Sequence, residues 1–183
     1  MKAKLDAPTI LCWVKRFLVY LLGLYLMAMG VVFSATSSLG VSPVGSLANV
    51  IYQIGLAKNA PDWVNLGNCT IAVYCLYILT EFILLRKDFK LSMLLQLVAS
   101  FLFGWLVNLA TAMLSGILPT PQTYLVKLLY LLCSIPLVAC GVMLYLSPQI
   151  LPTPGEGMSL AISKKTGLTI GSSKRSEERR VGK

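Results

Sequence analysis

Residues 17–36 form the uncharged run FLVYLLGLYLMAMGVVFSAT, which is followed at residues 37–45 by the segment SSLGVSPVG. A helix needs about 20 mostly apolar residues to cross the hydrocarbon core of a bilayer. The run reaches this length without a charged side chain, and the glycines and proline after it disfavour continuation of a helix. The sequence therefore predicts a membrane-spanning helix that is followed by a break in the backbone.

Three further apolar runs predict three more spans, at residues 64–85, 91–118 and 124–146. Glu81 is the only charge in the first of these runs, and Lys127 lies in the first turn of the last. Lipid offers the backbone no hydrogen-bond partners, so spanning segments are helices or closed barrels, and the alternating pattern of barrel strands is missing here. The predicted fold is an all-α, polytopic transmembrane bundle with four full spans.

The composition excludes most other classes of protein. The chain has 183 residues, of which 56% are hydrophobic and 13% are charged, whereas an ordinary soluble domain has about 25% charged residues. The sequence contains no His, no CxxC pair among its five Cys, and no P-loop, GxGxxG or HExxH motif. We therefore expect no metal site, no cofactor and no enzymatic activity.

The basic residues give the expected orientation. There are 16 Lys and Arg against 7 Asp and Glu, for a formal net charge of +9, and most of the excess lies in short patches between apolar runs. This placement is typical of loops on the cytoplasmic side of a membrane and argues against a nucleic-acid partner. With the N-terminal segment 1–16 in the cytoplasm, all patches fall on that side: Lys2, Lys4, Lys15, Arg16, Arg86, Lys87, Lys90, Lys164, Lys165 and Lys174.

Aromatic residues lie near the ends of the predicted spans, where their rings prefer the membrane interface. We expect Trp13 and Tyr145 at the cytoplasmic boundary, and Trp63 and Tyr124 at the opposite one. An alternative for the first span is a cleaved signal peptide, because small residues follow Phe33 and basic residues precede the run.

An internal repeat emerges when the chain is shifted by 111 residues. Gly30 then lies on Gly141 and Pro43 on Pro154, and after a one-residue insertion Gly45 lies on Gly157. Each copy predicts a span, a Pro/Gly break and a short helix, at residues 46–56 and 158–166, that is re-entrant or interfacial. The break residues that we single out are Ser42, Pro43, Gly45, Pro154, Gly155 and Gly157.

The two copies are predicted to run in opposite directions, because three spans separate equivalent points. Residues 17–118 would form the first repeat and residues 124–174 the start of the second. Inverted repeats with broken helices at matching positions occur in many secondary transporters. The sequence therefore favours a small-solute transporter whose partners are the lipid bilayer and a small anionic or polar solute. Two alternatives stay open. The duplication could serve only to stabilise the bundle, or the protein could be an accessory or sensory membrane protein that acts through partner contacts. A homo-oligomer is compatible with each of these functions.

Polar residues inside the spans are candidates for a solute or ion path, because they are costly in lipid. Asn108 lies midway along the third span, and Glu81 lies one turn from the end of the second. Asn49 and Gln53 lie one turn apart on the first short helix. For each there is a structural alternative: helix packing for Asn108, an ion pair with Arg86 or Lys87 for Glu81, and contact with lipid headgroups for Asn49 and Gln53.

Small residues at four-residue steps predict close helix contacts. Ser100 and Gly104 precede Asn108 at this spacing in the third span. Gly30 and Gly141 are the matching small residues of the first and fourth spans. We expect these four small residues to pack helices against one another.

Residues 175–183 read RSEERRVGK, and six of these nine residues are charged. The segment resembles, residue for residue, the translation of a widely used adapter for DNA sequencing libraries. The repeat predicts the counterpart of the second span at this point instead. We therefore expect a C-terminally truncated copy with a non-native tail, and the alternative is a natural charged tail.

Several of these features occur together in a known group of proteins. The basic N-terminus, Gly30, the LGVSP segment at residues 39–43 and the ending IGL at 54–56 partly recur as PTPGEG at 152–157 and TGL at 166–168. Over residues 10–174 the chain resembles bacterial integral membrane proteins of the YczE/YitT type. The resemblance implies a multi-pass protein of the bacterial inner membrane and implies no particular substrate. The second copy departs from the pattern by Pro152 and by the extra residue before Gly157.

Overall fold

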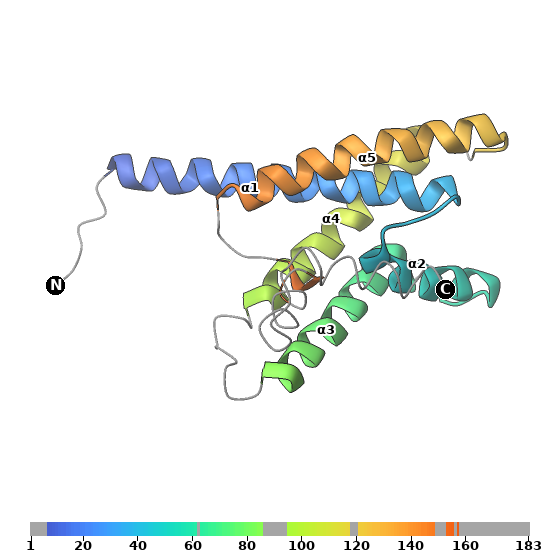
Figure 1. The fold of residues 1–183 in the computed structure, drawn as a ribbon, viewed down its shortest axis with the longest axis horizontal. Helices are drawn as coiled ribbons and strands as arrows, with labels where there is room; N and C mark the ends of the chain where they lie inside the picture. Colours follow the sequence, from blue (N-terminus) through green and yellow to red (C-terminus); the bar gives the residue numbers. More distant parts are fainter. Residues whose placement is uncertain are drawn as a thin grey trace.

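The computed structural model describes residues 7–61, 63–85, 95–117, 121–148, 153–155 and 157. This part of the chain is all-α and contains no strand, as predicted, and Figure 1 labels its five helices. Four of them are long and apolar enough to cross a membrane, so the chain has the character of a multi-pass membrane protein. The helices are α1 (Ala7–Ser37), α2 (Pro43–Ala57), α3 (Leu66–Leu85), α4 (Leu95–Ile117) and α5 (Tyr124–Leu146).

Several predictions fall outside these described residues. They concern the second short helix at 158–166, the tail at 175–183, and the basic residues between α3 and α4. The fourth predicted span coincides with α5, whereas α1 begins ten residues before the predicted start of the first span. Lys15 and Arg16, which directly precede the apolar run, therefore belong to the same helix, and the candidate membrane span starts at Cys12.

The break after α1 is built by serines, a glycine and a proline. Ser38 has a φ of 55°, the left-handed conformation that ends many helices. The Ser34 hydroxyl donates to the carbonyl oxygen of Gly40 at 2.7 Å, which folds the connection back onto α1. Ser42 then caps α2 by accepting from the Gly45 N–H, and Pro43 takes the first helical position. The short helix consequently starts three residues earlier than predicted.

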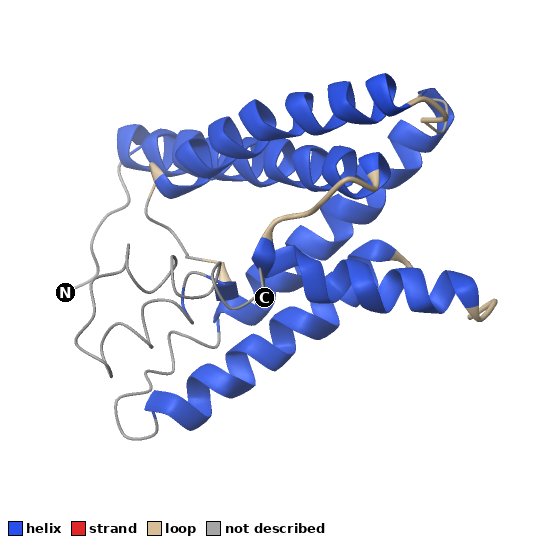
Figure 2. Cartoon of the chain, turned by 45° about the vertical axis from the view of Figure 1, so that its right-hand side comes forward, coloured by secondary structure: helices blue, strands red, loops and turns tan. Residues whose placement is uncertain are grey.

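The five helices form two layers. In both cartoon views α1 and α5 lie side by side and antiparallel, while α3 and α4 form a second pair that crosses beneath them (Figure 1, Figure 2). The α1–α5 contact is the most extensive between any two helices, α4 links the two layers through α1, and α2 packs on α3. The main core lies where the layers meet and includes Leu24, Ala28, Phe103 and Val107.

Glycines allow the closest approaches in both pairs. A Cβ added at Gly141 of α5 would lie 2.5 Å from the backbone nitrogen of Met27 in α1. One added at Gly104 of α4 would lie 2.8 Å from the carbonyl oxygen of Gly67 in α3. Because any side chain at these positions would collide with backbone, small residues at these crossings are a requirement of the packing.

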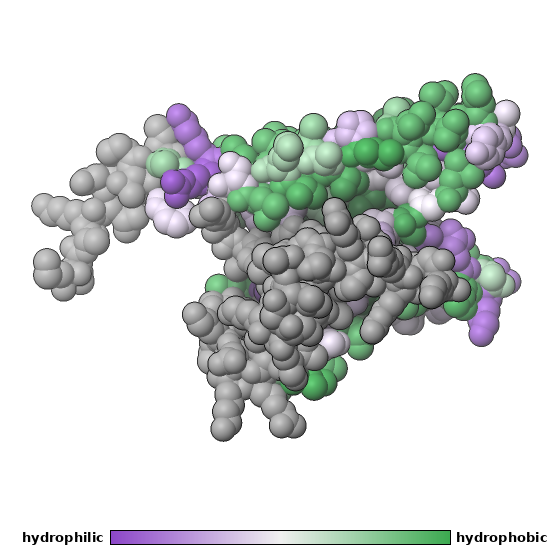
Figure 3. All heavy atoms as spheres, in the orientation of Figure 1, coloured by the Kyte–Doolittle hydropathy of each residue, from purple (hydrophilic) through white to green (hydrophobic). Residues whose placement is uncertain are grey.

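The outer surface of the upper layer is apolar. Figure 3 shows hydrophobic residues along the visible side of α1 and α5. Large side chains such as Leu22, Leu129 and Leu132 are more than half exposed, which is the expected state of a helix face that meets lipid tails. Of the aromatic residues predicted at the span ends, Tyr145 is buried and packs edge-on against Tyr20 in the contact between α1 and α5.

Candidate functional site

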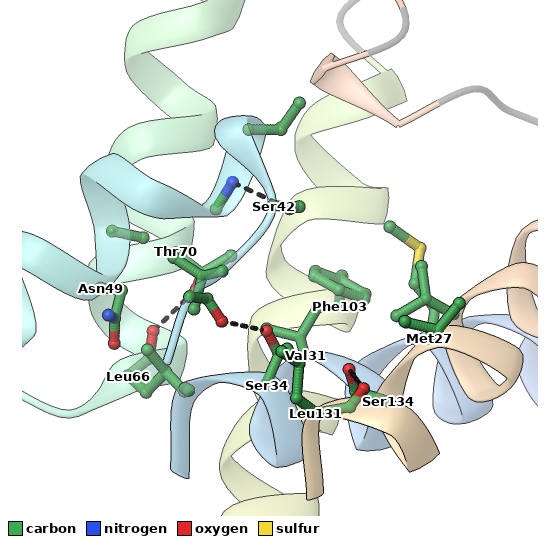
Figure 4. A pocket seen from close by; sticks show the side chains of 18 of the residues that line it. Met27, Val31, Ser34, Ser42, Asn49, Leu66, Thr70, Phe103, Leu131 and Ser134 are labelled. Atoms are coloured by element: carbon green, nitrogen blue, oxygen red, sulfur yellow. Dashed lines mark hydrogen bonds between the residues drawn. The ribbon is translucent and has the colours of Figure 1, made fainter. Parts of the chain in front are cut away.

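A cavity of about 530 Å³ lies between the two layers. Its walls come from α1, α5, the first break and α2, α3 and α4, so every helix contributes (Figure 4). Most of the lining is apolar, with Met27, Val31 and Phe103 among the larger side chains. The position between two helix layers is typical of solute sites in helical membrane proteins.

Hydroxyl groups supply most of the polar lining. Ser34, Thr70 and Ser134 each donate to a backbone carbonyl oxygen at 2.7 Å, the first to Gly40 of the break and the other two within α3 and α5. Figure 4 shows these side chains around the same space. Their oxygens keep lone pairs that can accept a hydrogen bond from a solute. None of the described residues that line the cavity is charged.

Asn49 of α2 is the polar side chain with unmet capacity in this lining. Its Oδ1 atom is buried, and no donor among the described residues reaches it. Buried amide oxygens without a partner are uncommon in folded proteins, so this atom is a candidate acceptor for a ligand or for water. Gln53, one turn further along α2, is exposed and does not line the cavity.

The first Pro/Gly break contributes directly to the cavity. Ser42 and Gly45 belong to the lining, together with Gly40 and Val44. Pro43 sets the start of α2 and thereby places these residues at the edge of the space. The break therefore brings the N-terminal turn of α2 against the cavity.

A second polar cluster lies at the far end of α3. Glu81 is 1% exposed, and the side chain of Gln96 in α4, 3% exposed, hydrogen-bonds to it. Gly157 of the second break covers the pair, because a Cβ added there would lie 2.8 Å from Glu81 Oε2 and 2.9 Å from Gln96 Oε1. Both of these oxygens lack a hydrogen-bond partner among the described residues. Arg86 and Lys87, the ion-pair partners considered from the sequence, are not among these residues.

The two breaks meet near this cluster. A Cβ at Gly155 would lie 2.7 Å from the side chain of Val44 in the first turn of α2. The Tyr77 hydroxyl donates to the Val44 carbonyl oxygen at 3.1 Å, so α3 fixes the same turn. Pro154 is fully buried, and the Gly157 N–H bonds to the Thr153 carbonyl oxygen at 3.0 Å. The Pro/Gly segments that the sequence analysis paired are thus in contact.

Asn108, which the sequence analysis considered for a solute path, lies instead at the contact between α4 and α3. Its Oδ1 accepts from the Gly67 N–H at 3.0 Å, and its Nδ2 donates to Asn68 Oδ1 at 3.2 Å. It does not line the cavity. The N–H groups in the first turn of a helix have no partner within that helix, and Asn108 supplies one to Gly67. This contact supports the alternative given for Asn108 in the sequence analysis, a role in helix packing.

The four predicted packing residues are all buried, and two further residues escaped the sequence analysis. Gly30, Ser100, Gly104 and Gly141 lie at helix contacts or in the core. Gly23 was missed although it meets Gly141 and Tyr145, because one glycine in an apolar run carries little signal. Gln96 was also missed, although a glutamine inside an uncharged span is as costly in lipid as the asparagine at position 108. In the part of the chain that the structure describes, no three His, Cys, Asp or Glu side chains lie close enough together to hold a metal ion.

Comparison with known proteins gives a family and no named relative. Residues 14–176 match the family of unknown function DUF6198. No curated protein and no solved structure matches the chain significantly. The likeness to YczE/YitT-type proteins therefore remains a resemblance at the level of sequence motifs. With four helices of spanning length and a match over most of its length, the chain belongs to DUF6198, a family of unknown function.

Proposed function

We propose that this protein is a secondary transporter of a small, uncharged and weakly polar solute, and that it acts as a carrier and not as a catalyst. The observation that carries the proposal is the cavity of about 530 Å³ between the helix layers, with the unpartnered Asn49 oxygen in its wall. Its mostly apolar lining with a few acceptors fits such a solute better than an anion, because no described lining residue is basic.

The inverted repeat is part of this proposal, and the contacts of two glycines support it. A Cβ at Gly30 would lie 2.9 Å from the nitrogen of Val138 and 3.1 Å from the oxygen of Ser134. One at Gly141 would lie 2.5 Å from the nitrogen of Met27 and 2.9 Å from the oxygen of Gly23.

The two sets of contacts correspond under the shift of 111 residues, which places residue 30 on 141, 27 on 138 and 23 on 134. Gly30 of α1 thus meets residues 138 and 134 of α5, just as Gly141 of α5 meets residues 27 and 23 of α1. Such reciprocity is the mark of a twofold contact between related elements. The antiparallel course of α1 and α5 fits the opposite orientation that the repeat requires. This support is independent of the apolar composition that inflates sequence matches.

The orientation is proposed from the basic patches, with the N-terminus in the cytoplasm of a bacterium and the protein in its inner membrane. Reporter fusions at Asn59, Lys87, Gln122 and Lys164 test it. The first and third fusions are expected to report the outer side and the other two the cytoplasm. Any other pattern contradicts the proposed orientation.

Access of water to the cavity tests the transport proposal without knowledge of the solute. In a variant whose five native cysteines are replaced, Ser134→Cys is treated with a membrane-impermeant thiol reagent in right-side-out and in inverted vesicles. A carrier that opens alternately to each side is expected to show labelling in both preparations. Ala110→Cys is the matched control, because Ala110 is fully buried and outside the lining.

The opposite outcome would favour the accessory or sensory alternative. If Ser134→Cys stays unlabelled from both sides while the protein is folded, the cavity is dry and closed, and transport through it is excluded. Labelling of Ala110→Cys at the same rate would show general opening of the bundle and would also contradict the proposal.

A further inference from the structure

Two buried polar side chains, each with an oxygen that lacks a described donor, meet beneath Gly157 at the C-terminal end of α3. Glu81 and Gln96 are 1% and 3% exposed, and Oε2 of the first and Oε1 of the second have no described donor. The position that a Cβ of Gly157 would take lies 2.7 Å from Gln96 Nε2, 2.8 Å from Glu81 Oε2 and 2.9 Å from Gln96 Oε1. Gly157 therefore lies directly over the Gln96 amide and the carboxyl oxygen that has no described donor.

A buried carboxylate requires compensation for its charge, since removal of an ion from water is expensive. The Gln96 side chain hydrogen-bonds to Glu81, but a neutral amide leaves the charge uncompensated, and Glu81 Oε2 and Gln96 Oε1 keep no described donor. One monovalent cation satisfies both oxygens at once. A proton on Oε2 can be donated to Gln96 Oε1, and a small hard cation such as Na⁺ prefers oxygen ligands of this kind.

We propose that Glu81 and Gln96 bind a single monovalent cation, H⁺ or Na⁺, beneath Gly157. Its role as the coupling ion of transport rests on the function proposed above. The binding itself does not, because it follows from the burial and unmet capacity of the two side chains.

A chain of contacts links this cation site to the cavity. Gly157 and Gly155 belong to the same break, Gly155 meets Val44, and Val44 lines the cavity. A displacement of the second break would therefore uncover the cation and move a wall of the cavity together. This is the kind of element through which an ion and a solute can influence each other's binding.

The experiment uses the full chain in detergent, with tryptophan fluorescence to follow unfolding. The unfolding midpoint is measured with increasing NaCl and with choline chloride at equal ionic strength. If the cation is Na⁺, the midpoint rises with NaCl and saturates, and the rise is absent in choline. If it is H⁺, the midpoint does not respond to Na⁺, and infrared spectra contain the carbonyl band of a protonated carboxylic acid that disappears in Glu81→Gln.

Substitutions separate the two ions and supply controls. Gly157→Ala places a methyl group against Glu81 Oε2 and the Gln96 amide, so it abolishes a Na⁺ response but leaves a protonated carboxyl band in place. Gly40→Ala is its control, because a Cβ there has no heavy atom within 4 Å. Gln96→Met is compared with Gln53→Met on the exposed side of α2, and only the former is expected to change the Na⁺ response or the band position.

The proposal is overturned if the wild-type chain has neither a saturable Na⁺ response nor a protonated carboxyl band assigned to Glu81. Should Glu81→Gln fail to fold, loss of the Na⁺ response in Gly157→Ala decides for Na⁺, and a shift of the carboxyl band in Gln96→Met assigns that band to Glu81. If no cation binds but Ser134→Cys is labelled from both sides, the transport proposal stands and the cation proposal fails. If a cation binds but Ser134→Cys stays unlabelled, the cation site stands and only its role as a coupling ion is lost.

Discussion

The two antiparallel helix pairs solve the same packing problem in different ways. In both α1–α5 and α3–α4, glycines bring the backbones together. The ends of the α1–α5 contact are closed by aromatic pairs, Tyr20 with Tyr145 at 6.4 Å and Phe33 with Tyr130 at 5.6 Å between ring centroids. The ends of the α3–α4 contact carry amides and a carboxyl group.

This difference separates packing by shape from packing by directional bonds. At one end of the α3–α4 pair, Asn108 bonds to Gly67 and Asn68, and at the other Gln96 lies beside Glu81. Lipid tails are as apolar as the helix surfaces, so association in a membrane depends on close packing and on polar bonds. The directional bonds fix the register of α3 on α4, whereas complementary shape holds α1 on α5.

The largest effect should come from disruption of the shape-dependent pair. Gly141→Leu inserts a side chain where the Met27 backbone lies 2.5 Å from the Cβ position. We expect a loss of about 3 kcal/mol or more in the free energy of unfolding, because backbone has to move apart. The midpoint of detergent-induced unfolding measures it.

Gly116→Leu on α4 is the control for this substitution, since a Cβ at Gly116 meets no heavy atom within 4 Å. It should change the unfolding free energy by only about 0.5 kcal/mol, as is usual for exposed positions. Equal losses in both variants would contradict the packing of α1 on α5 described above.

An intermediate effect tests the symmetry of that pair. Gly30→Ala and Gly141→Ala each add one methyl group to equivalent contacts, and each should cost about 1–3 kcal/mol of unfolding free energy. The expectation specific to the repeat is that the two losses agree within about 0.5 kcal/mol. A loss confined to one of the two glycines would count against the reciprocal contact.

The smallest effect concerns the directional pair. Asn108→Leu removes the partner of the Gly67 N–H and the bond to Asn68, so we expect a loss of about 1–2 kcal/mol in the unfolding free energy. Asn68→Ala should cost less, about 0.6 kcal/mol, because the bond from Gly67 to Asn108 remains. The same unfolding assay decides it, and an unchanged midpoint in Asn108→Leu would deny these hydrogen bonds a role in stability.

Much of the fold was predictable because lipid imposes few options on the backbone. Length and apolarity gave the four spans, and the fourth coincides with α5. Serine followed by proline is a typical start of a helix, and α2 begins in this way at Ser42 and Pro43. The predicted helix began three residues later, at residue 46. The extension of α1 was not predictable from the apolar run, because the basic residues before it do not prevent a helix.

The candidate sites were only partly predictable, because spacing along one helix does not say which helix lies opposite. Glu81 and Gly157 were each singled out, but their meeting with Gln96 depends on how α3, α4 and the second break come together. Likewise, the sequence does not distinguish Asn49 from Gln53 as a candidate. The packing of α2 places Asn49 in the cavity lining and leaves Gln53 exposed.

The sequence by itself determined the solvent of this protein and the helical form of its spans, because a hydrogen-bonded backbone within lipid allows little else. The tertiary structure decided which polar groups are satisfied and which are left with unmet capacity. Asn108 is satisfied because Gly67 lies opposite it, whereas Glu81 Oε2 has no donor among the described residues although Gln96 and Gly157 lie beside it. That distinction depends on contacts between residues far apart in the chain, and so it could not be seen before the helices were packed.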